Sequence, residues 1–155
     1  MNEIRSRRDE QLDDLEQEVG VLIRRARRVV RARAEAVHAE LSAPAYMILR
    51  FLKERGAVRA SLISECFETD KGAVSRQVQH AIELGLVERS ADPDDRRASL
   101  LQLTATGEQG LADVDAMRRE RLKERLDEWD EEALTALVAQ LHRYNRLFED
   151  IDHAF

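Results

Sequence analysis

The chain has 155 residues, of which 43% are hydrophobic and 36% are charged, and its formal net charge is −6. This length suits one domain with a hydrophobic core, and the longest runs without a charged residue reach only about ten residues, which excludes the ~20 apolar residues of a membrane-spanning helix. The N-terminus also lacks the apolar core of a signal peptide, so we expect a cytoplasmic protein.

Residues 12–41 predict a long amphipathic helix. Apolar side chains recur there at intervals of three and four residues, and no proline interrupts the segment. Periodicity leaves open whether this is one helix or two helices that meet near Gly20. The segment also carries arginines at positions 24, 25, 27, 28, 31 and 33. We favour a solvated helix face over a phosphate-contacting strip or the wall of an anionic-ligand pocket, because charge-rich helix faces are common.

Two shorter helices are expected further along the chain. The first covers Ala60–Cys66. The second begins at Thr69 or Asp70, whose side-chain oxygens suit a helix N-cap, and it ends at Gly85, which suits the left-handed residue after a helix. The apolar stripe of the second helix consists of Val74, Val78, Ala81, Ile82 and Gly85. The short link between the two helices predicts a helix-turn-helix, the unit that sets its second helix in the major groove of DNA.

After this helix, two short apolar runs flank a charged loop. Residues 86–89 and 99–104 are rich in Val and Leu, whereas residues 90–98 contain a proline and several aspartates that favour an exposed turn. We expect a two-stranded hairpin with Arg96 and Arg97 at its tip, where long cationic side chains can enter a minor groove. Asp95 would repel phosphate, so its expected role is to orient one of these arginines. The alternative is a charged loop that is only solvated.

The C-terminal third of the sequence predicts two more helices. Thr106–Gln109 has the spacing of a capping box and opens a helix that runs to about Glu128, and Asp130 can cap a third helix whose apolar stripe ends at Phe148. Helices of this length carry more apolar surface than a small core can cover. The surplus predicts a two-fold dimer interface built from both chain ends, with the two recognition helices ~34–36 Å apart.

Together these elements predict a mainly α fold with a small β-hairpin wing (α+β). The architecture is a winged helix-turn-helix flanked by long N- and C-terminal dimerisation helices. We expect a single domain over residues 1–155, with a DNA-binding core at about 41–107 and dimerisation helices at 8–40 and 106–150.

Several short motifs are spread over residues 41–107. They are Leu41-Ser42, Tyr46, Leu49, Leu52, Gly56, Ser61-Leu62-Ile63, Val74-Ser75-Arg76, Leu84-Gly85-Leu86-Val87-Glu88-Arg89, Asp95-Arg96-Arg97, Leu103-Thr104 and Gly107. In this order and spacing they resemble the MarR family of bacterial and archaeal transcriptional regulators. Leu62-Ile63-Ser64 departs from the family, which more often has Leu-Ala there. The resemblance implies a winged-helix homodimer that binds a pseudo-palindromic operator. It also implies that the dimer releases the operator when a small ligand, often an aromatic acid or phenol, binds near the dimerisation helices.

The candidate DNA-binding residues lie on the polar face of the second helix and at the tip of the hairpin. They are Lys71, Ser75, Arg76, Gln79, His80, Arg96 and Arg97, with Asp95 orienting a wing arginine. By the resemblance, Ser75 and Arg76 match base-reading positions, and Arg97 matches the wing arginine that enters the minor groove.

The candidate effector pocket consists of His38, Tyr46 and Arg50. The resemblance implies a pocket in this region, and an arginine with a tyrosine can hold a carboxylate or phenolate. The alternative is that Tyr46 belongs to the core while His38 and Arg50 lie on the surface.

The sequence predicts no metal site, no cofactor and no redox sensor. The four histidines show no paired spacing of the kind that a metal site requires, and one cysteine does not form an internal disulfide. Cys66 is expected to be a packed core residue because of its helical spacing with Leu62. Glu65 and Glu68 do not supply the cationic surroundings of a reactive thiolate.

The net charge raises an objection to DNA binding, because DNA phosphates attract basic proteins. Residues 106–155 hold 13 acidic and 7 basic residues, whereas residues 1–105 hold 18 of each. The acidic excess thus lies outside the expected DNA-binding core. We therefore expect DNA binding that depends on a dimer and on arginines at specific positions, with modest affinity for nonspecific DNA.

We predict a sequence-specific repressor whose partners are double-stranded operator DNA, a second copy of the chain and a small aromatic or anionic effector. The alternative is a winged-helix scaffold or protein-interaction module without specific DNA reading, which the acidic balance suggests. An enzyme is not expected, because the sequence has no glycine-rich phosphate loop, no nucleophile with a recognisable base and no placed carboxylate pair.

Overall fold

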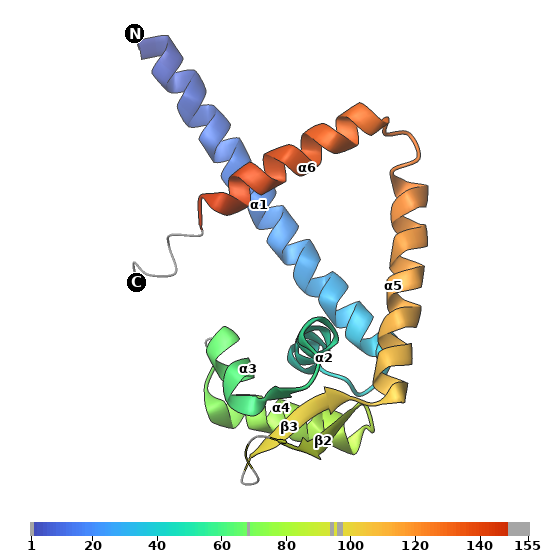
Figure 1. Cartoon of the computed structure of the whole chain (residues 1–155). Helices are drawn as coiled ribbons and strands as arrows, with labels where there is room; N and C mark the ends of the chain where they lie inside the picture. Colours follow the sequence, from blue (N-terminus) through green and yellow to red (C-terminus); the bar gives the residue numbers. More distant parts are fainter. Residues whose placement is uncertain (1, 68, 94, 96–97, 149–155) are drawn as a thin grey trace. The chain divides into compact units, whose positions relative to one another are not determined.

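The structure is a computed structural model that describes residues 2–67, 69–93, 95 and 98–148 (Figure 1). Its elements are, in chain order, α1 (Asn2–Val37), α2 (Ala43–Arg55), β1 (Val58–Arg59), α3 (Ala60–Cys66), α4 (Lys71–Glu83), β2 (Val87–Ala91), β3 (Ser99–Leu103), α5 (Ala105–Arg125) and α6 (Glu131–Arg146). This mainly helical arrangement with a small antiparallel sheet confirms the predicted fold class. The chain divides into two compact units, Met1–Asp115 and Ala116–Phe155. Within the described residues, no helix combines the length and apolar character needed to cross a membrane.

The first helix is continuous. α1 runs for 36 residues without a break at Gly20, which answers the question that periodicity left open. Near its C-terminal end, Val30 and Val37 pack against the core and Ala34 is fully buried. Further toward the N-terminus the apolar stripe is open to solvent in the single chain, and Leu22 is 57% exposed. Among the described side chains of α1, those that belong to the core or pack against it lie in the last turns of the helix.

The core of the first unit is built around α2. Ser42 caps this helix, because its Oγ accepts a hydrogen bond from Ala45 N at 3.1 Å. Gly56 ends the helix with a φ of +75°, a conformation that favours glycine. The buried residues of α2 are Ala45, Tyr46, Ile48, Leu49 and Leu52. They form one hydrophobic cluster with side chains from α1, α3, α4 and the sheet.

α3 and α4 form the predicted helix-turn-helix. α3 has the predicted bounds, Ala60–Cys66. α4 begins after Asp70, whose Oδ2 accepts a hydrogen bond from Ala73 N at 3.0 Å, so the predicted N-cap is confirmed. Gly85 follows α4 with a φ of +70°, also as predicted. α4 turns Val74, Val78 and Ala81 into the core.

The wing is a three-stranded antiparallel sheet, not the predicted two-stranded hairpin. Its strand order is β1-β3-β2. β2 and β3 pair as expected, with Val87 opposite Leu103. The additional strand β1 contains only Val58 and Arg59 and pairs with β3. Two residues are too few to show the alternation that identifies a strand in a sequence. β1 is a strand only because it pairs with an edge of β3.

A close contact joins the start of α5 to the turn after α4. The residue that caps α5 is Thr104, not the predicted Thr106. Thr104 Oγ1 accepts a hydrogen bond from Gly107 N at 3.1 Å and donates one to Gly85 O at 2.6 Å. A Cβ atom at Gly107 would lie 2.2 Å from Leu86 O, so the approach requires glycine. The capping-box spacing does not identify the cap, because the choice between the two threonines depends on the tertiary contact with Gly85.

Cys66 is exposed, so its predicted place in the core is wrong. α3 turns Ile63 and Ser64 inward, with exposed fractions of 0% and 8%, whereas Leu62 is 37% exposed. A helix of seven residues makes about two turns. Spacing over so short a segment does not specify which side faces the core.

The second unit contains the C-terminal part of α5 and all of α6. Asp130 caps α6 as predicted, because its Oδ1 accepts a hydrogen bond from Ala133 N at 2.7 Å. The rings of Tyr144 and Phe148 make an edge contact with their centroids 5.1 Å apart. No residue of α6 is buried in the single chain, and Val138 in its apolar stripe is 52% exposed.

Candidate nucleic-acid interface

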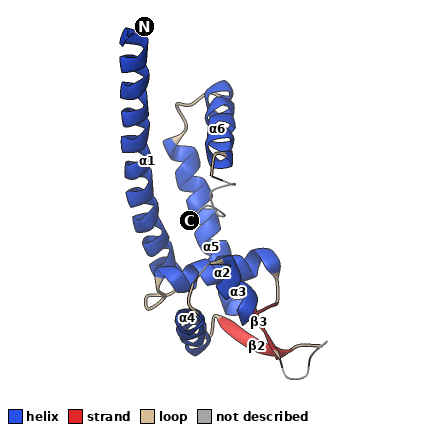
Figure 2. Cartoon of the chain, turned by 90° about the vertical axis from the view of Figure 1, so that its left-hand side faces the viewer, coloured by secondary structure: helices blue, strands red, loops and turns tan. Residues whose placement is uncertain are grey.

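The solvent-facing side of α4 carries polar side chains at helical spacing. Four of the predicted DNA-binding residues are exposed there, namely Lys71, Ser75, Arg76 and Gln79. The opposite side of the helix is buried in the core. Figures 1 and 2 show α4 and the β2–β3 hairpin at the same end of the first unit. The two elements therefore form one polar end that a duplex can approach.

Contacts from the loop between α1 and α2 hold α4 in place. His80 Nε2 lies 2.8 Å from Glu40 O, and Ser42 Oγ donates a hydrogen bond to Gln77 Oε1 at 2.5 Å. The His80 side chain is half-buried. It therefore connects α4 to the loop in this structure, and its role in DNA binding stays a prediction.

A small groove between α3, α4 and β2 brings two cationic side chains together. Its volume is about 190 Å³, and its lining includes Lys71 and Ser75 of α4, Ser61 of α3 and Arg89 of β2. Ammonium, guanidinium and hydroxyl donors in one groove suit phosphate oxygens. Lys71 and Ser75 were predicted as DNA-binding residues from the sequence, whereas Arg89 and Ser61 were not, because their proximity to α4 depends on how α3 and the sheet pack.

The base of the wing is held by an ion pair that was not predicted from the sequence. Arg59 of β1 donates from Nε and Nη2 to Asp92 Oδ2, in both cases at 2.6 Å. Asp92 follows β2 and is only 5% exposed, and a carboxylate so buried requires a cationic or hydrogen-bonding partner. The pair therefore fixes the start of the wing loop against β1. Arg96 and Arg97, which Asp95 was expected to orient, lie outside the described residues.

The three candidate effector residues have different surroundings. Tyr46 is 3% exposed and belongs to the hydrophobic core. His38 Nδ1 accepts a hydrogen bond from Glu40 N at 3.2 Å. Arg50 Nη1 donates to both carboxylate oxygens of Asp115, at 2.7 and 2.8 Å. Arg50 thus has an anionic partner already, and a carboxylate ligand would compete with Asp115 for its guanidinium group.

Asp115 is the centre of an ion cluster between α2 and α5. Lys53 Nζ lies 2.8 Å from Asp115 Oδ2, in addition to the contact with Arg50. Burial raises the pKa of the Asp115 carboxyl, but hydrogen bonds from Lys53 and Arg50 outweigh burial and hold the pKa below its ordinary value of 3.8. The carboxylate is therefore ionised at neutral pH and ties α5 to α2.

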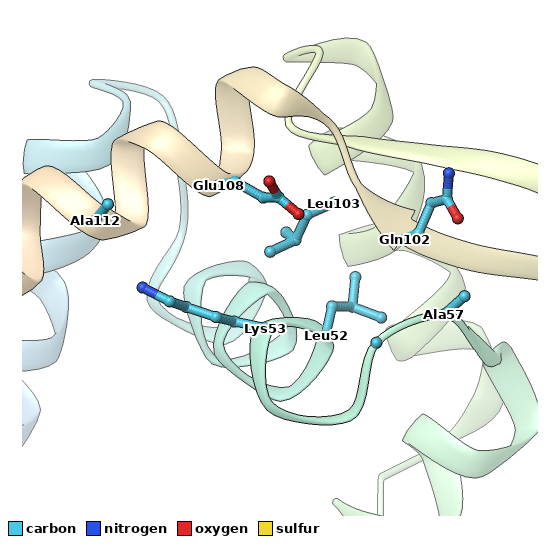
Figure 3. Close-up of a pocket in the computed structure, with 8 residues that line it drawn as sticks. Leu52, Lys53, Ala57, Gln102, Leu103, Glu108 and Ala112 are labelled. Atoms are coloured by element: carbon cyan, nitrogen blue, oxygen red, sulfur yellow. The ribbon is translucent and has the colours of Figure 1, made fainter.

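A cavity of about 550 Å³ lies between the C-terminal end of α2, β3 and the first turns of α5 (Figure 3). Lys53, which pairs with Asp115, is part of its lining. The volume lies within the roughly 300–1,000 Å³ typical of small-molecule sites. None of the three candidate effector residues lines this cavity.

The arginine-rich stretch of α1 lies mostly on the surface. The arginines at positions 24, 25, 27, 28 and 31 are exposed, whereas Arg33 is half-buried. Arg31 Nε lies 3.5 Å from Glu35 Oε1, but both side chains are more than half exposed. Solvent weakens such a pair to below about 1 kcal/mol. This exposure is compatible both with a solvated helix face and with a phosphate-contacting strip, so the solvated face stays a prediction.

Comparison with known proteins identifies the family of the chain. A sequence model described as MarR family matches residues 40–98. The HTH-type transcriptional regulator YxaD of Bacillus subtilis strain 168 is 33% identical over 136 residues, which cover 88% of this chain and 94% of YxaD. The chain belongs to the MarR family. As a MarR-family protein it is a DNA-binding transcriptional regulator with a winged helix, and its helix-turn-helix lies inside the matched segment.

Solved structures of MarR proteins share the fold. One MarR family transcription regulator superposes with a TM-score of 0.80 at 21% identity, over 95% of this chain and 96% of its own. Wild-type MarR of E. coli in its apo form gives a TM-score of 0.68 at 18% identity, over 84% of this chain and 95% of its own. The likeness extends beyond the matched segment, so the long flanking helices also belong to the MarR fold.

Proposed function

We propose that this MarR-family chain is a repressor that binds a pseudo-palindromic operator as a homodimer and is released by a small-molecule effector. The observation that carries the proposal is the division of α4 into two faces. Val74, Val78 and Ala81 fix the helix in the core, while Ser75 and Arg76 are exposed, and α4 lies at the same end of the first unit as the β2–β3 hairpin (Figure 2). A helix held in this way can present side chains to base edges with little loss of conformational freedom on binding.

The proposed reading mode gives different roles to different residues. Ser75 and Arg76 contact base edges in the major groove, since arginine suits bidentate bonds to guanine. Lys71 and Arg89 contact the phosphate backbone from their groove and set the position of the helix. Arg96 and Arg97 enter the minor groove from the wing.

The dimer is supported by exposed apolar side chains at both chain ends. These side chains are Leu12, Leu15, Leu22, Ile23 and Val29 of α1, and Leu137, Val138 and Leu141 of α6. Large apolar faces that stay exposed in a single chain mark sites of protein association. A two-fold dimer would place two copies of α4 on successive turns of the same DNA face, ~34–36 Å apart.

The experiment is a fluorescence-anisotropy titration of the full chain against its own upstream intergenic DNA, with a random duplex as the competitor, at low and moderate salt. Regulators of this kind often control adjacent genes. A repressor keeps its preference for the site when salt rises, whereas a scaffold shows at most weak attraction that salt removes. Arg97→Ala should weaken site binding if the wing arginine enters the minor groove. Undiminished specific binding by this variant would contradict the proposed wing contact.

Effector release is tested separately, with Arg50→Ala and Tyr46→Phe. If these residues hold an anionic effector, both variants should bind operator DNA but respond less to aromatic acids. An unchanged response in both variants would remove them from the effector site.

A further inference from the structure

Arg59 occupies a position where a helix is normally capped. It is the N-cap residue of α3, and N-cap positions favour Ser, Thr, Asp or Asn, whose side-chain oxygens accept hydrogen bonds from the first amides of the helix. The guanidinium group of arginine has no acceptor, and the Arg59 side chain makes no cap hydrogen bond. The first helix of the helix-turn-helix therefore lacks a side-chain cap, and the residue at the cap position makes a different contact.

That contact crosses the sheet to the end of β2. Arg59 pairs with Leu100 of β3, and Leu100 pairs with Ser90 of β2, so these three residues form one row on the same face of the sheet. Alternation continued past β2 places Asp92 on that face as well. β3 lies between β1 and β2, and two strand spacings amount to roughly 10 Å. By bonding Asp92, Arg59 joins the two outer strands of the sheet across the middle strand.

Asp92 lies at the neck of the wing, which we define as Asp92 and Ala98. Asp92 N donates a hydrogen bond to Ala98 O at 3.3 Å, and Ala98 N donates one to Asp95 O at 2.9 Å. The Asp92 side chain is 5% exposed, whereas the Arg59 side chain is 47% exposed. Burial of a carboxylate destabilises a fold unless the carboxylate is paired or hydrogen-bonded. The bond to Arg59 therefore favours one position of the neck.

Arg59 also connects the neck to the helix-turn-helix. The next residue, Ala60, is the first residue of α3, and Ile63 of α3 lies in the same hydrophobic core as Val74 and Val78 of α4. β2 already joins the wing to the C-terminal end of α4 along the chain. Arg59 adds a second connection, through α3. Two connections fix the orientation of the wing relative to α4, whereas one connection would leave a hinge.

We propose that Arg59 is a positioning residue for DNA binding, which acts through Asp92 to hold the wing at a fixed distance from α4. This inference rests on the proposed function, in which α4 and the wing contact the same duplex. Two elements bind one duplex more tightly when their spacing is set before binding, because less conformational freedom is lost. Without the Arg59–Asp92 pair, α4 and the wing would bind more independently. Arg59 itself need not touch DNA in this role.

The first test removes the pair from its acidic side. Asp92→Asn takes a negative charge from the proposed DNA-binding end, and attraction to phosphates alone would then make binding tighter. The inference predicts the opposite, about tenfold weaker binding to the upstream duplex by fluorescence anisotropy, the loss expected for one charge-assisted hydrogen bond. Glu88→Gln removes an exposed carboxylate of β2 and should bind at least as tightly as wild type. Equal or tighter binding by Asp92→Asn would overturn the inference.

A double-mutant cycle identifies the element through which Arg59 acts. The background is Arg59→Thr combined with Asp92→Asn, because threonine can cap α3 and asparagine removes the buried charge. Circular dichroism and urea denaturation check that this background folds. Arg97→Ala should weaken operator binding at least threefold less in this background than in wild type, whereas Arg76→Ala should have the same effect in both. Additive effects at Arg97 would mean that Arg59 does not act through the wing.

Hydrogen exchange tests the pair without DNA. The Ala98 amide, whose bond to Asp95 O lies at the neck, should exchange about tenfold faster in Asp92→Asn than in wild type. The Val78 amide of α4 should keep its rate, which separates a loosened neck from a destabilised fold. An unchanged rate at Ala98 would contradict the role of the pair.

These measurements also keep the two proposals apart. If wild type shows no preference for the upstream duplex over random duplex, the proposed reading of DNA is rejected, and hydrogen exchange still decides whether the pair holds the neck. If wild type shows the preference and Asp92→Asn binds with wild-type affinity, only the positioning role of Arg59 is rejected.

Discussion

At the scale of single residues, Gly107 brings two elements together by having no side chain. A Cβ atom there would lie 2.2 Å from the backbone oxygen of Leu86, so Gly107→Ala forces α5 away from the turn after α4. We expect this substitution to lower the free energy of unfolding by about 1–3 kcal/mol, the usual cost of overpacking. Urea denaturation of both proteins measures the difference.

The control for this prediction is Gly20→Ala. Gly20 lies inside α1, and a Cβ atom there would have the flexible end of Arg24 as its nearest neighbour, at 3.3 Å. Alanine stabilises a helix interior by about 1 kcal/mol relative to glycine, so this variant should be more stable than wild type. Equal effects at the two positions would contradict the close contact at Gly107.

Asp115 predicts how the stability of the fold responds to acid. Its folded-state pKa lies below the ordinary value of 3.8, so its ion pairs stabilise the fold fully above that pH and lose this effect as pH falls through the folded-state pKa. Asp115→Asn should lower the free energy of unfolding by about 1 kcal/mol at pH 7. The difference from wild type should shrink below about pH 4. Urea denaturation at pH 7 and pH 3 measures both effects.

Asp113→Asn is the matched control for this experiment. Asp113 is exposed on the same helix and accepts a hydrogen bond from Gln109 Nε2 at 2.8 Å, so its loss should change stability little. If Asp115→Asn lowered stability by the same amount at both pH values, the ion cluster would not be the cause.

At the scale of elements, local signals predicted some segments well and others poorly. The bounds of α4 were predictable because Asp70 caps it and Gly85 ends it, and both signals depend on the backbone of the helix itself. β1 was not predictable, because a strand of two residues exists only through its pairing with β3. Thr104 caps α5 for the same kind of reason, since its bond to Gly85 O joins elements that are distant in the sequence.

The candidate site likewise contains residues that were predictable from the sequence and residues that were not. The exposed polar face of α4 was predictable from the 3.6-residue period. Arg89 and the Arg59–Asp92 pair were not, because strand packing brings each of them to its partner. Arg50 was named as an anion-binding residue without its partner Asp115, which lies on another helix.

The cap of α4 gives a prediction at this scale. Asp70 Oδ2 accepts a hydrogen bond from Ala73 N at the start of a helix of 13 residues. Asp70→Ala should lower the free energy of unfolding by about 1 kcal/mol, and Asp70→Asn should retain most of the stability because asparagine also caps helices. Thermal or urea denaturation measures both. Equal losses in the two variants would mean that the charge of Asp70, rather than its cap, stabilises α4.

At the scale of the whole molecule, the exposed apolar face of α1 predicts self-association. Leu22 is 57% exposed in the single chain, so Leu22→Glu should change the stability of an isolated protomer by less than about 0.5 kcal/mol. In a dimer that covers this face, the same change buries a charge and should shift the protein toward monomer. Analytical ultracentrifugation measures the shift. Leu62→Glu alters an exposed leucine of α3 and should leave the dimer intact, whereas equal behaviour of both variants would argue against an interface on α1.

The measurement that tests the central claim most directly is the specificity of Arg76→Ala. The preference for the upstream duplex over random duplex is measured by fluorescence anisotropy for wild type, Arg76→Ala and Arg121→Ala, the last of which removes an exposed arginine of α5. If α4 reads base edges, Arg76→Ala should lose about tenfold or more of this preference and Arg121→Ala should keep it. Arg76→Ala with the wild-type preference would contradict the assignment of α4 as the reading helix.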